Sequence, residues 1–163
     1  MEFTTIKEYF YKLQTAFLLT LLLPLVIFLV FYSNTDQGLV EQEQSIVIIS
    51  FLLFLMLFDT FTGLILFRIK LKGIRQQPSL RSRLQRYYSL TIVRSCINVV
   101  ACSMPTLAFF LTMDARLVFV FAGALIFFFL QWPGPRNVCR DLQLKGDERE
   151  MVLYKKENLS VQK

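Results

Sequence analysis

The stretch LQTAFLLTLLLPLVIFLVFY, from Leu13 to Tyr32, decides the fold class of this chain. None of its 20 residues is charged, and a helix needs about 20 apolar residues to cross roughly 30 Å of hydrocarbon. The stretch is too long for the apolar region of a cleaved signal peptide, and no small-x-small cleavage pattern follows it. The sequence therefore predicts a membrane-spanning helix over 13–32.

Three more apolar blocks follow along the chain. They cover residues 46–67, 87–111 and 117–132. The last block is only 16 residues long and is stopped by Pro133 and Pro135, so a buried or re-entrant segment is the alternative to a span there. We predict an all-α membrane protein, a bundle of four transmembrane helices within residues 1–135. A basic, partly helical tail over 136–163 completes the chain.

The distribution of Lys and Arg predicts how these spans are oriented. The chain has 18 such residues, and 16 of them fall before the first block, between the second and third blocks, or after the fourth. The segment 33–45 has none, and the short segment after the third block has only Arg116. Cytoplasmic segments of membrane proteins carry the excess of Lys and Arg. We therefore expect an antiparallel multi-pass bundle with both termini on the cytoplasmic side.

Composition excludes several chemistries. The chain contains no histidine, which removes bis-His haem, the usual catalytic zinc sites and Ser-His or Cys-His triads. Its three cysteines, Cys96, Cys102 and Cys139, form no C-x-x-C pair, and we interpret them as structural. A net charge of +6 suits nucleic acid or a membrane surface, and the long apolar blocks favour the membrane. We expect no cofactor, no metal, no catalytic residue and no nucleic acid partner.

Asp59 and Arg94 are the charged residues inside the apolar blocks. Charges in hydrocarbon are costly and usually face the protein interior. Asp59 lies nine residues before Arg68 and Arg94 eight residues after Arg86, so both should lie at the same depth. We predict an intramembrane ion pair that joins the second and third spans. A proton or ion relay is the alternative.

The third block carries a polar face. Tyr87, Thr91, Asn98 and Cys102 recur, together with Arg94, at spacings of three or four residues, so they share one side of a helix. Polar side chains of this kind join membrane helices by hydrogen bonds. We predict that this face contacts other helices, and the wall of a narrow pathway is the alternative.

The segment between the second and third blocks is strongly basic. It contains Arg68, Lys70, Lys72, Arg75, Arg81, Arg83 and Arg86. Topogenic charge explains the cluster fully, and contact with anionic lipid head groups or an acidic partner is the functional interpretation. In the tail, Leu142 to Leu159 contains apolar residues that we expect to pack on the membrane or on a partner.

No motif in the chain indicates a reaction, so we expect a non-enzymatic integral membrane subunit. It would assemble with itself as a homo-oligomer or with a larger membrane complex. The alternative is a small channel or transporter in which Asp59 and Arg94 line an ion or proton pathway.

Overall fold

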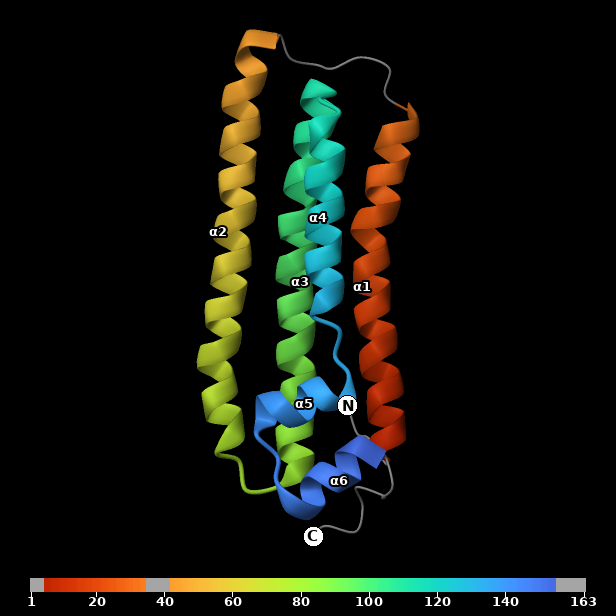
Figure 1. Ribbon diagram of the computed structural model, residues 1–163, viewed down its shortest axis with the longest axis vertical. Coiled ribbons are helices and arrows are strands. Elements are labelled where there is room, and N and C mark those ends of the chain that lie inside the picture. Colours follow the sequence, from red (N-terminus) through yellow and green to blue (C-terminus); the bar gives the residue numbers. More distant parts are fainter. Residues whose placement is uncertain (1–4, 35–41, 155–163) are drawn as a thin grey trace. The chain divides into compact units, whose positions relative to one another are not determined.

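The computed structural model describes residues 5–34 and 42–154, and within these ranges it is all-helical and contains no strand. Its elements are α1 (Ile6–Asn34), α2 (Gln42–Arg75), α3 (Leu80–Thr112), α4 (Arg116–Leu130), α5 (Pro135–Leu142) and α6 (Gly146–Tyr154) (Figure 1). Helices α1, α2 and α3 are each long and apolar enough to cross a membrane. Helices α4 and α5 make a fourth candidate if this pair, bent by 72°, counts as one span. The predicted all-α fold is confirmed, and so is the presence of three to four helices that are long and apolar enough to cross a membrane.

Side-chain caps mark where α1 and α3 begin. The hydroxyl of Thr5 accepts a hydrogen bond from the backbone N–H of Glu8 at 3.1 Å, which caps α1. The hydroxyl of Ser79 does the same for the N–H of Ser82 at 3.2 Å, so α3 begins directly after it. Since α2 ends at Arg75, only residues 76–79 separate the two helices. Most of the basic segment between the second and third apolar blocks is therefore helical. An apolar block marks only the apolar part of a helix and not its charged ends.

The chain divides into two compact units, and each of the three long helices contributes to both. Unit 1 consists of residues 1–18, 65–93 and 132–163, and unit 2 of residues 19–64 and 94–131. Unit 1 therefore contains one end of α1, the tip of the α2–α3 hairpin, and α5 and α6.

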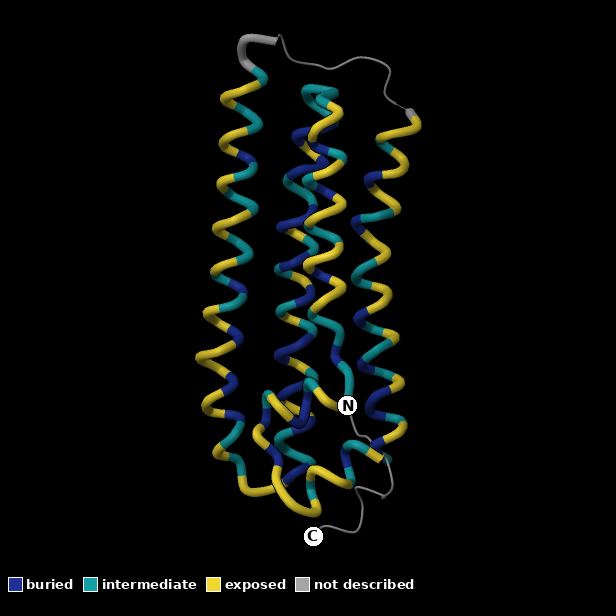
Figure 2. The backbone as a smooth tube through the Cα atoms, in the orientation of Figure 1, coloured by how far each residue is buried: buried dark blue, intermediate teal, exposed yellow. Residues whose placement is uncertain are grey.

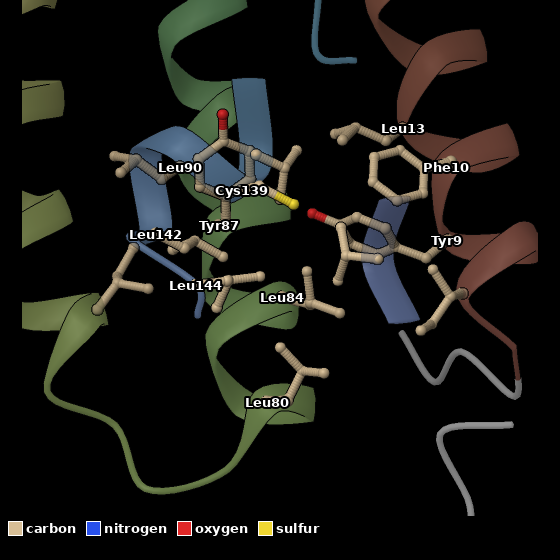
Figure 3. Packing of buried hydrophobic residues seen from close by; sticks show 14 of the residues in the cluster. Tyr9, Phe10, Leu13, Leu80, Leu84, Tyr87, Leu90, Cys139, Leu142 and Leu144 are labelled. Carbon is tan, nitrogen blue, oxygen red and sulfur yellow. The ribbon is translucent and has the colours of Figure 1, made fainter. Parts of the chain in front are cut away.

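Unit 1 has a hydrophobic core built from three parts of the chain. Ile6, Tyr9, Phe10 and Leu13 recur along α1 at helical spacing and are all buried. They belong to one cluster with buried residues of the hairpin and of the tail, and Figure 3 shows these side chains pointing toward one another. The hairpin and tail members are Phe67, Leu71, Ile74, Leu80, Leu84, Tyr87, Leu90, Val138, Cys139, Leu142, Leu144 and Val152.

The tail therefore packs on its own chain. The expectation that its apolar residues need the membrane or a partner is wrong for Leu142, Leu144 and Val152, which are buried in the unit 1 core. The charged ends of α1, α2 and α3 supply the apolar side chains against which these residues pack. Gln143 adopts a left-handed backbone (φ 53°) at the end of α5, and the N–H of Leu144 bonds to the carbonyl of Cys139 at 3.0 Å. Residues 155–159 of the predicted segment lie outside the described residues.

Unit 2 packs through aromatic contacts and one close helix approach. Phe28 of α1 stacks on Phe121 of α4, with ring centroids 4.1 Å apart, and its ring lies 5.4 Å from that of Phe109 in α3. Helices α2 and α3 approach at Gly63, where an added Cβ would lie 3.0 Å from Cγ2 of Ile97. A larger residue at position 63 would push these helices apart.

Helix α2 is the long helix that the chain covers least. In its most apolar stretch 11% of the residues are buried, against 44% for α3. Figure 2 shows exposed residues recurring along the part of α2 that it colours by burial. The exposed side chains include Phe51, Phe54, Phe58 and Phe61. In water such a surface would be unfavourable, whereas lipid tails or a partner helix can cover it without cost.

Candidate functional site

An apolar groove lies between α2, α3 and α4 in unit 2, with a volume of about 400 Å³. It is lined by α2 residues between Met56 and Leu64, by Asn98 and Cys102 of α3, and by α4 residues between Val120 and Phe128. Gly123 and Ala124 belong to the α4 wall, and a Cβ added at Gly123 would meet no atom within 4 Å. The groove therefore has room for side chains that this chain does not supply. We call it the apolar groove.

The predicted polar face of α3 is buried in both units. In unit 1, Tyr87 and Thr91 are buried, and the hydroxyl of Tyr87 donates to Oδ2 of Asp141 at 2.9 Å. In unit 2, Asn98 and Cys102 are buried, and Nδ2 of Asn98 donates to Oε1 of Gln131 at 2.7 Å. These bonds join α3 to α5 and to the end of α4, which is the arrangement expected of polar residues that hold helices together.

Sequence reasoning missed two further buried polar residues of α3 and the two acceptors from other parts of the chain. Ser95 and Thr106 are buried on α3, and their spacing of four residues from Thr91 and Cys102 could have revealed them. The acceptors Gln131 and Asp141 carry no such signal, because a partner from another helix is determined only by packing.

The structure places Asp59 on α2 and Arg94 on α3, both half-buried in unit 2. The contact of Gly63 with Ile97 fixes the register of the hairpin there. Asp59 lies four residues before Gly63 and Arg94 three before Ile97, so in opposed helices the two Cα atoms are offset by roughly 10 Å along the axis. The ion pair stays a prediction from the sequence, and this offset leads us to expect only a weak coupling between the two side chains.

Six of the seven basic residues of the α2–α3 hairpin fall into two groups with different environments. Arg75 donates from Nε to the carbonyl of Asp141 at 2.7 Å, and Arg83 forms an ion pair with Glu148 of α6. These two residues hold the tail against the hairpin. Arg68, Lys70, Lys72 and Arg86 are exposed.

Lys70 and Arg86 line a second groove, of about 810 Å³, on the hairpin in unit 1. We call it the cationic groove. Its other lining residues are Gly73, Ile74, Gln77, Ser82, Gln85, Ser89, Leu90 and Val93, and none of the lining residues is acidic. The groove thus combines two positive charges and several hydrogen-bond donors with an apolar wall, which is a suitable environment for an anionic group attached to an apolar body.

A third hollow, of about 860 Å³, lies over α5 and α6 and is lined by Arg136, Arg140, Lys145 and Arg149 together with Cys139. Burial raises the pKa of the Cys139 thiol, and the charge of Arg149 has the opposite, smaller effect. A buried, protonated thiol suits a structural role. Among the described residues, no group of three or more Cys, Asp or Glu side chains could hold a metal ion.

Comparison with known proteins gives no identity for this chain. No protein-family model matches it, and no match was found among curated proteins or among solved structures. Its function must therefore be argued from its own geometry.

Proposed function

We propose that this chain is a non-enzymatic, multi-pass membrane subunit that assembles through the apolar groove. The occupant would be an apolar transmembrane helix, from a second copy of the chain or from a larger membrane complex. The open space at Gly123 and Ala124 carries the proposal. In lipid, helices associate by close packing and not by a hydrophobic effect, and small residues permit that approach. The light coverage of α2 by its own chain supports the same surface.

The topology we propose is an antiparallel bundle of four spans, with the apolar block 117–132, which contains nearly all of α4, as the fourth and both termini cytoplasmic. Its support is that 16 of the 18 Lys and Arg residues lie in segments on one side of such a bundle. Single cysteines at Gln42 and Gln77, in a chain lacking Cys96, Cys102 and Cys139, would test it. In intact cells an impermeant maleimide should label Gln42→Cys and not Gln77→Cys. Labelling of Gln77→Cys would reverse the orientation.

Filling the apolar groove tests the assembly. Ala124 lines the groove, whereas Ala122, two residues earlier on α4, is exposed and lies outside it. Ala124→Leu should therefore shift the purified protein from a defined complex toward the free chain, and Ala122→Leu should leave the complex intact. Native mass spectrometry of protein in lipid nanodiscs gives the mass and thus separates a homo-oligomer from a complex with another protein. A wild-type chain that is monomeric and carries no other protein would contradict the proposal.

A small channel or transporter is the second candidate, and the half-buried Asp59 and Arg94 in unit 2 favour it. An ion pathway needs polar groups along its length, and the apolar groove offers few. Reconstituted liposomes loaded with pH-sensitive or cation-sensitive dyes would discriminate. We expect no flux above that of empty liposomes. Flux that is lost in Asp59→Asn would favour the channel.

A further inference from the structure

We infer that the cationic groove binds the phosphate-bearing head group of an anionic membrane lipid. This site goes beyond the proposed assembly and depends on none of its residues. The groove is lined by Lys70 of α2 and Arg86 of α3, so an anion bound in it would face a positive charge from each helix. Arg binds phosphate oxygens with paired N–H donors, and Lys adds a compact positive charge.

The charges of this groove are not used by the rest of the described chain. Neither Lys70 nor Arg86 takes part in an ion pair with residues 5–34 or 42–154. Arg75 and Arg83, on the same hairpin, are in contrast bonded to Asp141 and Glu148 of the tail. Topogenic charge alone would require no such division, because any basic residue at this level would serve equally well.

The lining of the groove changes from polar to apolar along its length, as a lipid changes from its head group to its acyl chains. On α3 its lining residues Ser82, Arg86, Ser89 and Val93 follow one another at spacings of three or four, so they lie on one face. From Ser82 to Val93 this face extends roughly 16 Å. The hydroxyl and charged residues come first and the apolar ones last, toward the apolar part of the helix. An anionic head group would lie against Arg86, and the upper part of an acyl chain against Leu90 and Val93.

Gly73 gives the site a space that can be filled without changing its charge. It lines the groove, and a Cβ added to it would meet no atom within 4 Å. A leucine there would occupy the groove, and it would suit the α2 helix better than glycine.

The experiment measures lipid retained by the full-length protein, purified in detergent, by native mass spectrometry. The probes are dioleoyl phosphatidylglycerol, dioleoyl phosphatidylcholine and soluble glycerol phosphate. Wild-type protein should retain phosphatidylglycerol in preference to phosphatidylcholine. Lys70→Gln and Arg86→Gln should each weaken that retention about fivefold, since a basic residue near an anionic surface contributes about that factor. Gly73→Leu should weaken it as well.

Matched controls separate a built site from general positive charge. Arg68→Gln and Lys72→Gln each remove the same charge from an exposed residue of α2 that does not line the groove, and Ala122→Leu adds bulk at an exposed residue outside both grooves. These controls should bind as wild type does. If the Arg68 and Lys72 controls lost as much lipid as the Lys70 and Arg86 variants, the site would be overturned. Equal retention of phosphatidylglycerol and phosphatidylcholine by the wild-type protein would overturn it as well. Glycerol phosphate that displaced the lipid at equal concentration would identify a soluble ligand and overturn the lipid assignment. An unchanged melting temperature in lipid-free detergent confirms that each variant is folded.

Discussion

Units 1 and 2 use the same kinds of apolar residue in opposite ways. Unit 1 buries them in a shared core with short polar connections between its helices, such as that of Tyr87 to Asp141. Unit 2 leaves much of its apolar surface uncovered, most of all on α2, and packs mainly through phenylalanine contacts such as that of Phe28 with Phe121. The hydrophobic effect acts where water is the alternative environment. In hydrocarbon, burying a phenylalanine inside the protein brings no hydrophobic gain, because lipid tails are already apolar.

The division of charge follows the same boundary. The residues of unit 1 include 16 of the 18 Lys and Arg of the chain. The basic residues predict that unit 1 lies outside the hydrocarbon. Unit 1 is also the unit that has a buried hydrophobic core of the kind found in water-soluble proteins. The difference teaches that solvent, and not composition alone, decides whether an apolar side chain must be buried by its own chain.

The largest test of this contrast compares two leucines. Leu84 is 1% exposed in the unit 1 core, and Leu130 is 73% exposed on α4 of unit 2. Leu84→Ala should lower the free energy of unfolding by about 2 to 5 kcal/mol and open the tail to trypsin at Arg140. Leu130→Ala should change neither. Unfolding in mixed micelles and timed proteolysis measure both, and a comparable loss at Leu130 would show that unit 2 is also held together by burial within the chain.

A smaller effect is expected for the polar contact between α3 and α5. Tyr87→Phe removes the donor to the Asp141 carboxylate and should cost about 1.5 to 3 kcal/mol, as for other hydrogen bonds to charged groups. Tyr11→Phe is the control, because Tyr11 is 72% exposed on α1. The same unfolding measurement applies, with amide hydrogen exchange in α5 and α6 reporting release of the tail. Equal stability of the two variants would mean that apolar packing alone holds the tail.

The smallest effect concerns the charges of unit 2. The register set by Gly63 and Ile97 offsets Asp59 from Arg94, and helical side chains lean toward their own N-termini, in opposite directions here. A double-mutant cycle of Asp59→Asn and Arg94→Gln should therefore give a coupling energy below about 0.5 kcal/mol, near the limit of additivity. A coupling above about 1 kcal/mol would establish the ion pair and bring unit 2 closer to unit 1 in its use of polar contacts.

Much of the fold could be read from the chain, and the sites only in part. The apolar blocks predict the long helices because crossing hydrocarbon requires a run of apolar residues whatever the neighbours are. The polar face of α3 is visible as a spacing, and Tyr87, Thr91, Asn98 and Cys102 are buried in the structure. Its acceptors Gln131 and Asp141 are not visible, since they come from elements far away in sequence.

The sequence by itself determined that this chain is helical and apolar enough to span a membrane, since each helix satisfies its own backbone hydrogen bonds and needs no partner to do so. The tertiary structure alone decided that the tail joins a core with α1 and the hairpin, because that core exists only when three distant segments meet. It also decided which basic residues bind the tail and which line the cationic groove. A one-dimensional pattern gives the face of a helix on which a residue lies, and packing determines what that face meets.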